Sequence, residues 1–291
     1  MRYEVTRVNK IKKTKLHQKD APLVRIRKLS RYSDFEKLVD IQRIVWKHED
    51  MDLIPTHQFR ISSKMGGILL GAFVGEELAG FVYSFPAVFE KKPCQHSHLL
   101  AVLPVYRGFG IGKKLKWAQR ESALKFGYDL ITWTMDPLQA KNANLNFHTL
   151  GAMTRTYLPH FYGATPSLMH ASNIPTDRIL IEWPISKKKV EMRRRGKYDE
   201  YDEAKLRRVL ENKSGENDSL PDRPRLSLKE KLILVEVPRK IKALEKNPHL
   251  VSAWQTGLRK VLTHYFRRGY AAGDFLFGER CFYVLEKLTK T

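Results

Sequence analysis

The best candidate for an anion-binding site is a run of glycines and basic residues, Arg107-Gly108-Phe109-Gly110-Ile111-Gly112-Lys113-Lys114. Residues 99–103, before it, are apolar and strand-like, and Pro104 cannot donate a hydrogen bond to a sheet. Apolar residues recur at helical spacing after it. The glycines therefore stand at the N-terminus of a predicted helix, where unpaired N–H groups and the positive end of the helix dipole bind anions. A phosphate or pyrophosphate site is one interpretation of the run, and a plain tight turn is the other.

Two common phosphate-binding loops do not fit this run. A Walker loop ends in Gly-Lys-Ser/Thr, whereas this one continues Gly112-Lys113-Lys114. A dinucleotide-binding loop has glycines spaced G-x-G-x-x-G and an acidic residue that closes the next strand. Here the spacing is R-G-x-G-x-G in the middle of the chain, and Asp129 opens the next predicted strand. We therefore expect neither of these folds.

Composition limits the class of protein. A chain of 291 residues can bury a substantial core without cross-links. Its two cysteines, Cys94 and Cys281, form no spaced framework, as is typical of a reducing compartment. No apolar run approaches the ~20 residues that a membrane-spanning helix needs, and the N-terminus lacks an apolar signal core. We expect a cytoplasmic protein with no membrane partner.

Basic residues outnumber acidic ones, which gives a formal net charge of +22. Much of the excess lies in residues 2–31 and in two short runs, 187–189 and 193–195. Such a surface attracts nucleic acid, acidic lipid and coenzyme A alike, so charge alone does not select a partner. Solvated, mobile charge is the interpretation that we favour for these runs, and a nucleic-acid-binding surface is the alternative.

Apolar periodicity and turn signals predict a mixed α/β protein. Ser33 and Glu36 form a capping box that marks a helix start, and Gly127 and Gly151 are placed to end two later helices. Residues 86–94 are expected to form a loop. Strands are predicted at residues 24–29, 68–74, 78–85, 96–103, 129–135, 153–158, 179–183, 232–237, 271–277 and 281–285. Helices are predicted at residues 34–47, from 55, at 112–126, 142–150 and 248–267.

A charged segment of low hydrophobicity divides the chain. Residues 186–230 carry runs of charge followed by Gly, Ser, Asn and Pro, and we interpret them as a mobile insertion or linker with one possible helix at 203–210. The predicted units are a basic flexible arm at 1–22, a main domain at 23–185, this linker, and a strand, helix and hairpin at 231–291. The last unit is too small to stand alone, so we expect it to pack on the main domain.

The glycine run and its surroundings resemble one protein family. The pattern Val102-x-Pro104-x-x-Arg107-Gly108-x-Gly110-x-Gly112 resembles the acyl-CoA pyrophosphate loop of the GNAT superfamily of N-acyltransferases. Its neighbours resemble one GNAT branch with an extended C-terminal half, through His96-Ser97-His98, Trp133-Thr134-Met135-Asp136-Pro137-Leu138, Asn142-Ala143-x-x-Asn146 and Leu150-Gly151-Ala152. The resemblance covers residues 24–185 well and residues 232–286 more loosely. It implies the GNAT fold, a mixed α/β sheet, with an extra C-terminal segment.

The resemblance also implies how an acyl-CoA is held. Backbone N–H groups of the strand before the loop bind the acyl carbonyl and the pantetheine arm, and loop amides bind the pyrophosphate. Two asparagines on the later predicted helix, at 142–150, either bind pantetheine or cap and pack that helix. The residues implied are Leu100, Ala101, Val102, Leu103, Arg107, Gly108, Phe109, Gly110, Ile111, Gly112, Lys113, Asn142 and Asn146. Acetyl-CoA or another short acyl-CoA is the implied cosubstrate, and no metal is expected.

A base for the acceptor amine is expected on the strand before the loop. Alternation predicts that His96, His98, Leu100 and Val102 share one face. An imidazole with a pKa of about 6.5 suits proton removal near neutrality. Many GNAT enzymes carry a carboxylate base on this strand, at the place where His96 falls. His96 or His98 is thus the predicted base, directly or through water, and a packed or surface histidine is the alternative.

The acid that protonates the leaving thiolate is harder to place. Many GNAT enzymes use a tyrosine in the helix after the next strand, and the aligned residue here is Phe147, which carries no proton. Tyr157 and Tyr162 are the nearest replacements, and each could instead be a core tyrosine. We include Tyr157 in the predicted catalytic set with the two histidines.

The acceptor pocket is expected between the loop after the first helix and the C-terminal segment. Glu49 and Asp50 are candidates for contact with an acceptor amine, with solvated loop carboxylates as the alternative. Trp254, Arg259 and Tyr270 could reach the pocket if the C-terminal segment caps it. Arg259 would then pair with an acceptor carboxylate.

These features predict an acyl-CoA-dependent N-acyltransferase, within the transferases of groups other than aminoacyl groups. Its expected reaction moves a short acyl group, first of all acetyl, to a primary amine of a small molecule or amino acid by direct attack. Two alternatives stay open: a macromolecular acceptor, protein or RNA, reached through the basic surface, and a non-catalytic module that binds acyl-CoA or nucleic acid. Hydrolase motifs such as G-x-S-x-G and H-E-x-x-H do not occur.

Overall fold

The computed structural model describes residues 22–46, 50–163, 176–212, 214, 219–244 and 247–289. Its strands are β1 (Val24–Lys28), β2 (Ile68–Val74), β3 (Glu77–Phe89), β4 (Lys92–Val102), β5 (Leu130–Met135), β6 (Met153–Leu158), β7 (Arg178–Pro184), β8 (Arg207–Leu210), β9 (Leu232–Val237), β10 (Tyr270–Phe277) and β11 (Cys281–Lys287). Its α-helices are α1 (Tyr32–Trp46), α2 (Thr56–Lys64), α3 (Ile111–Lys125), α4 (Ala140–Ala143), α5 (Lys188–Arg194), α6 (Ile241–Leu244) and α7 (Pro248–Arg267). Short 3-10 turns are η2 (Asp50–Asp52), η3 (Pro104–Tyr106) and η6 (Glu203–Lys205), and η4 (Asn144–Thr149) is a π-helix.

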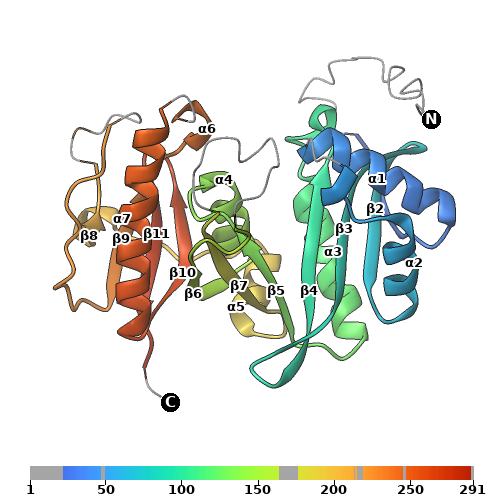
Figure 1. The fold of residues 1–291 in the computed structure, drawn as a ribbon. Coiled ribbons are helices and arrows are strands. Elements are labelled where there is room, and N and C mark those ends of the chain that lie inside the picture. Colours follow the sequence, from blue (N-terminus) through green and yellow to red (C-terminus); the bar gives the residue numbers. More distant parts are fainter. Residues whose placement is uncertain are drawn as a thin grey trace.

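One sheet runs through the molecule in the order β1-β2-β3-β4-β5-β7-β6-β10-β11-β9-β8 (Figure 1). The pairs β4–β5 and β8–β9 are parallel, and the other neighbours are antiparallel. The C-terminal strands join the first seven where Ala272 of β10 pairs with Thr154 of β6. The predicted mixed α/β fold with an extra C-terminal segment is therefore confirmed.

Helices cover both faces of the first half of the sheet. Tyr83 of β3 packs its ring against Phe59 of α2 and bonds Ser62 of the same helix at 2.7 Å. Ser97 of β4 points to the opposite face, where its hydroxyl meets Gln119 of α3. The histidines of β4 and the glycine run are positioned between these layers.

The C-terminal strands carry their own helix, α7. It begins as predicted, with Pro248 in the first turn and Asn247 accepting a hydrogen bond from the N–H of Leu250. Its apolar stripe is buried, with Leu258 and Val261 fully covered, and Figure 1 shows the helix lying along the C-terminal strands.

Buried ion pairs fasten the C-terminal segment to the rest. Asp274 of β10 accepts from Arg193 of α5 at 2.6 Å, and both side chains are 1% exposed. His148 of η4 contacts the same carboxylate at 3.1 Å. Because removing one partner of a buried pair leaves a charge without compensation, these contacts hold β10 against α5 and η4.

Two predictions about local structure were wrong. The expected loop at 86–94 is mostly strand, since β3 continues to Phe89 and β4 starts at Lys92. The pairing of β2 with β3 ends at Ser84, so Pro86 lies where β3 has become an edge strand that tolerates proline. The possible helix at 203–210 is instead the turn η6 followed by β8, which pairs with β9.

The segment at 186–230, interpreted as a mobile linker, contains ordered elements in its described part. Helix α5 and strand β8 lie there, and Val190, Val209 and Leu210 are buried. These two elements could not be predicted from sequence composition, because each contributes only a few apolar residues to the core.

Candidate active site

Strands β4 and β5 separate near the middle of the sheet. They pair only at Gln95 with Ile131 and at His96 with Thr132, whereas β3 follows β4 from Lys92 to Val102. From Ser97 onward, the β5-facing side of β4 has no strand partner among the described residues, and the two strands diverge (Figure 1). We call this separation, along residues 97–102, the strand gap.

Backbone groups of β4 alternate between β3 and the strand gap. The N–H of Leu103 donates to Ala79 O at 2.9 Å, and by alternation Ala101 also turns its N–H toward β3. Leu100 and Val102 therefore turn theirs toward the gap, where the carbonyl of Val102 accepts from Arg107 Nε at 3.1 Å. Of the four predicted backbone contacts, the structure turns two toward the gap and two away.

The glycine run begins at the C-terminal end of β4. Gly108 and Gly110 adopt φ of +94° and +72°, a left-handed conformation that strains other residues. No heavy atom would lie within 4 Å of a Cβ at either position, so both are open on that side. Arg107 is exposed beside them, as is Lys113 in the first turn of α3.

Helix α3 starts at Ile111 without a side-chain cap. Within the chain as described, the N–H of Lys114 donates to Gly110 O, and the N–H groups of Ile111, Gly112 and Lys113 have no backbone acceptor. Three donors at the positive end of a 15-residue helix are thus available to an anion. The assignment of this loop and helix to the pyrophosphate of coenzyme A stays a prediction from the sequence.

A β-bulge at His98 changes the predicted strand faces. Tyr83 pairs with Leu99 and Ser84 with Ser97, so His98 is an extra residue in β4. His96 and His98 do share a face, with ring centroids 6.5 Å apart. Leu100 and Val102 lie on the opposite face, the one covered by α3, contrary to the prediction from simple alternation.

The two histidines belong to an aromatic group on the face of α1 and α2. Phe85 lies 5.4 Å from the His96 ring and 5.8 Å from the His98 ring. His98 is exposed and His96 is half-buried. Burial, together with the neighbouring His98 and Lys116, lowers the pKa of His96 to about 4. His96 is therefore a neutral imidazole at pH 7, able to accept a proton.

Two threonines on β5 extend this group across the strand gap. Thr132 Oγ1 lies 3.0 Å from His96 Nδ1, and Thr134, on the same face of β5, contacts the hydroxyl of Tyr162 at 2.8 Å. Tyr162 is 44% exposed. Sequence reasoning missed both threonines, because nothing in a β-branched strand pattern distinguishes a threonine that faces a site from one that stabilises a strand.

The opposite face holds a buried amine. Lys116 of α3 is 2% exposed, donates to Gln119 Oε1 at 2.8 Å and to Ser97 Oγ at 3.2 Å, and lies 3.7 Å from the centre of the Trp133 ring. No carboxylate of the described residues forms an ion pair with it. Burial lowers the pKa of Lys116 well below its usual value, so desolvation outweighs the cation–π contact.

Replacing Lys116 with Met should stabilise the protein at pH 7 by roughly 1–3 kcal/mol, because an amine buried without a counter-charge is exchanged for an apolar side chain of similar volume. Ser97 and Gln119 remain bonded to each other. In the wild type the unfolded chain binds more protons than the native state below the usual lysine pKa, so stability rises with pH toward 10. Urea unfolding at pH 7 and pH 9.5 should show this rise in the wild type and its loss in Lys116→Met. The exposed Lys125→Met on the same helix serves as control; equal effects of both substitutions would contradict the argument.

The remaining predicted catalytic and acceptor residues lie apart from this group. Tyr157 donates to Asp177 Oδ2 at 2.6 Å, and burial raises its pKa far above 10. Arg259 places two guanidinium nitrogens on the same carboxylate, each at 2.8 Å. An acceptor carboxylate would have to displace Asp177 to reach Arg259, and Tyr157 holds its proton tightly.

Trp254 is 2% exposed and bonds the Ser219 carbonyl, within the C-terminal segment. Tyr270 is also buried, with its hydroxyl on the Glu230 carbonyl. Asp50 is exposed and pairs with Arg43 at 3.0 Å, and Glu49 lies outside the described residues. None of the three described side chains contacts the histidine group.

The two predicted asparagines differ in environment. Asn142 in α4 is exposed, whereas Asn146 is 6% exposed and its Nδ2 lies 3.0 Å from Met135 Sδ. Asn142 belongs to α4, whereas Asn146 belongs to the wider π-helical turn η4 that follows it, which changes the spacing of the side chains around the helix. Phe147 is fully buried and meets the Tyr283 ring edge-on at 5.4 Å, which fills the place where an acid was sought.

Within the described ranges, no group of three or more His, Cys, Asp or Glu side chains is arranged to hold a metal ion. Both cysteines are free and buried. Over the same ranges, no helix combines the length and the apolar character needed to cross a membrane.

Comparison with known proteins identifies the part of the chain that carries this geometry. Residues 33–151 match the model of the acetyltransferase (GNAT) family. Residues 33–151 form a GNAT acetyltransferase domain. The match includes the glycine run, the histidines and both strands of the gap, so the GNAT domain contains all of them except Tyr162. GNAT acetyltransferases use acetyl-CoA as acyl donor.

Several solved structures are similar to the chain. The yncA protein of Salmonella typhimurium, solved with its cofactor acetyl-CoA, is 15% identical over 57% of this chain and 95% of its own, with a TM-score of 0.47. The ribosomal-protein-S18-alanine N-acetyltransferase of Escherichia coli is 18% identical over 57% of this chain and 96% of its own, with a TM-score of 0.45. An aminoglycoside acetyltransferase from an uncultured soil metagenomic sample, solved in complex with sisomicin, is 18% identical over 39% of this chain and 78% of its own, with a TM-score of 0.36. A search of curated proteins gave no match.

Proposed function

We propose that this chain is an acetyl-CoA-dependent N-acetyltransferase that acts on a primary amine by direct attack, with its main domain at residues 23–185. One observation carries the proposal: the strand gap ends at a helix N-terminus whose first N–H groups are uncapped and whose two glycines are left-handed and open. A pantetheine arm needs an unpaired strand edge, and a pyrophosphate needs such a helix start. The chain places the two side by side.

The reaction needs a polarised carbonyl, a proton acceptor and a proton donor. The N–H groups of Leu100 and Val102, turned toward the gap, would hold the thioester and its arm. As the amine nitrogen bonds the acetyl carbon, its proton passes to His96, directly or through water. The carbon–sulfur bond then breaks, and the thiolate takes a proton.

Tyr162 suits the role of proton donor better than Tyr157. Its hydroxyl is exposed and bonds only a threonine hydroxyl, in the part of the chain that the structure describes. The hydroxyl of Tyr157, by contrast, is committed to Asp177. Thr134 contacts Tyr162, and Thr132, two residues earlier on the same face of β5, contacts His96.

Tyr162→Phe should therefore lower kcat roughly 10- to 100-fold and leave acetyl-CoA affinity unchanged, because only the proton donor is lost. Tyr32→Phe is a matched control, since Tyr32 is also exposed and its hydroxyl also contacts a threonine, Thr56, at 3.2 Å. Steady-state kinetics on both variants decide the matter. Equal rates for Tyr162→Phe and wild type would contradict this role for Tyr162 and would mean that water protonates the thiolate.

The acceptor is proposed to be a small molecule or an amino acid carrying a primary amine. The acceptor side of the gap is built of aromatic rings and hydroxyls around the neutral imidazole of His96, and the guanidinium of Arg178 lies over the Tyr162 ring at 5.1 Å. The direct test is incubation with acetyl-CoA and a panel of polyamines, amino acids and peptides. Free thiol is followed by a thiol reagent, for which the buried cysteines give little background, and product by mass spectrometry. Acetyl-CoA binding without acetylation of any amine would contradict the enzymatic proposal.

A macromolecular acceptor is the second candidate, favoured by the net charge of +22. The two candidates differ in their response to salt. A surface that tracks phosphates loses affinity steeply as ionic strength rises, whereas turnover of a small amine held near neutral side chains changes little. Acetylation of basic peptides or RNA-bound substrates at 50 and 300 mM salt separates them.

A further inference from the structure

A basic pocket lies at the C-terminal end of the molecule, outside the GNAT domain. It has a volume of about 650 Å³, and five of its lining residues are cationic: Lys229, Lys231, Arg267, Arg268 and Lys287. They come from three segments, before and at the start of β9, at the end of α7, and at the end of β11. Nothing in the proposed acetyl transfer uses them.

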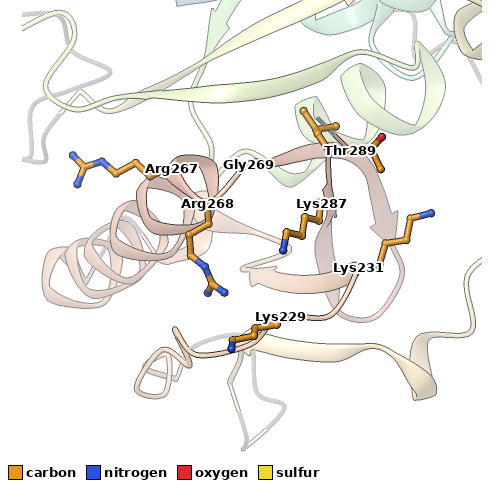
Figure 2. A pocket seen from close by; sticks show the side chains of 8 residues that line it. Lys229, Lys231, Arg267, Arg268, Gly269, Lys287 and Thr289 are labelled. Carbon is orange, nitrogen blue, oxygen red and sulfur yellow. The ribbon is translucent and has the colours of Figure 1, made fainter. Parts of the chain in front are cut away.

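Some of the basic side chains of the pocket extend into it, and others point away from it. Figure 2 shows Arg268 and Lys287 extending toward one space with Lys229 along its lower edge, while Arg267 and Lys231 point outward at the two sides. Three like charges around one space repel one another, so the arrangement gains most from an anion that bridges them. The rim charges then add to the field that attracts such an anion.

These cations are poorly compensated by the protein. Lys231 pairs with Glu286 at 3.6 Å, and Arg268 donates to the Leu226 carbonyl at 3.0 Å. Among the residues that the structure describes, no carboxylate lies within ion-pair distance of Lys229, Arg267 or Lys287. The C-terminus of α7 contributes about half a negative charge, which is too little to balance them. The pocket keeps a net positive charge.

The backbone beneath the pocket is fixed. The N–H of Lys287 donates to Lys231 O at 2.9 Å, and that of Leu288 to Gly269 O at 2.8 Å. The buried Tyr270 donates its hydroxyl to Glu230 O at 2.7 Å. The three segments are thus joined by hydrogen bonds, so the lysine stems start from set positions and less order must be gained on binding.

The residues that line the pocket indicate the chemical class of its ligand. The lining contains no carboxylate and no aromatic ring, so it offers neither a negative charge for a cation nor a surface on which a base could stack. Closely spaced phosphates match three cations around one space, one of them a guanidinium that can bond two oxygens. We propose that this pocket binds adjacent phosphate groups, supplied by a nucleic-acid backbone or by a free polyphosphate.

The test uses sodium tripolyphosphate and a labelled 15-nucleotide oligouridine RNA, titrated against the full chain carrying Gly110→Glu. That background removes the GNAT loop as a competing phosphate site. The pocket variant is Lys229→Ala with Lys287→Ala, two exposed side chains without a described partner. The matched control is Lys64→Ala with Lys125→Ala, which removes the same charge from exposed ends of α2 and α3.

We expect calorimetry to show tripolyphosphate binding at least tenfold weaker in the pocket variant and unchanged in the control. If RNA supplies the phosphates, its anisotropy titration weakens with the same variant, and the slope of log Kd against log salt falls by about two. If only tripolyphosphate binding responds, the ligand is a free polyphosphate. Equal binding by pocket and control variants overturns the proposal. Acetyl-CoA binding by the pocket variant with Gly110 intact is expected to be unchanged, so failure here and failure of the acetyltransferase proposal are distinguishable.

Discussion

Gly110→Glu should weaken acetyl-CoA binding at least a hundredfold in a calorimetric titration. The new carboxylate would stand at the start of α3, against the N–H groups of Ile111, Gly112 and Lys113, and would occupy the positive end of the helix dipole. It would also repel a pyrophosphate. A hundredfold loss of affinity corresponds to about 2.7 kcal/mol of binding free energy. The loss of several charge-assisted hydrogen bonds is enough to account for that amount.

Gly127→Glu is the matched control for this substitution. Gly127 lies just past the other end of α3 and has φ of +79°, and a Cβ added there would meet no heavy atom within 4 Å. The control therefore introduces the same charge and a similar backbone strain, without touching the N-terminal donors. Titrations of both variants with acetyl-CoA, succinyl-CoA and free CoA also identify the preferred donor. Equal affinities of the two variants would make the glycine run a simple turn.

The glycine run could be predicted because its requirements are local. A left-handed φ at Gly108 and Gly110, a helix start at Ile111 and basic flanking residues are all determined by neighbours in sequence. Helix α7 was equally accessible, since its proline, cap and apolar stripe lie within twenty residues. The predicted hairpin strands at β10 and β11 were confirmed for the same reason.

The composition of the acceptor side could not be predicted in this way. One extra residue at His98 moves Leu100 and Val102 to the other face of the sheet, and a bulge leaves no mark in a pattern of alternation. Thr132 contacts His96 only through the pairing of β4 with β5, and Tyr162 contacts Thr134 only through the path of the chain after β6. Likewise, Arg259 lies 82 residues from Asp177, so its partner depends on tertiary structure.

Lys116 shows how a residue type can mislead. It stands in a run of lysines, Lys113-Lys114-x-Lys116, which favours a solvated helix face. In the structure its side chain instead faces inward, where it bonds Gln119 and lies over the Trp133 ring. Burial of a lysine is rare, and no pattern in the sequence indicates it at this position.

His96→Ala should lower kcat/KM about a hundredfold or more, because the amine proton loses its acceptor. Acetyl-CoA affinity should stay the same, since the pyrophosphate loop is untouched. His98→Ala, made separately, tests whether the exposed histidine shares the role. His57→Ala is the control, being an exposed histidine on α2. If His96→Ala and His98→Ala together kept full activity, the base would have to be sought elsewhere.

The pH dependence gives a sharper test of the same assignment. A base must be neutral to act, and the pKa of His96, lowered to about 4 by burial and by His98 and Lys116, keeps the imidazole neutral well below pH 6. The rate, corrected for the fraction of neutral amine, should therefore stay level from pH 7 to about 5. Because the unfolded chain binds more protons than the native state between pH 4 and 6.5, the free energy of unfolding should also fall by up to about 3 kcal/mol as the pH drops through that window. Above pH 6.5, His96 should contribute no pH dependence to stability.

An NMR titration of the His96 ring, assigned with His96→Ala, measures that pKa without a known acceptor. Lys116→Met should raise it, since one of the neighbouring basic groups is removed while the burial remains. If the pKa of the His96 ring equals the apparent pKa on the acid side of the kcat/KM profile, the loss of activity at low pH is caused by protonation of His96. A ring pKa near 4 beside an activity limb near 6.5 would assign the proton to a group other than His96, and His98 would not explain such a limb, because burial lowers its pKa as well.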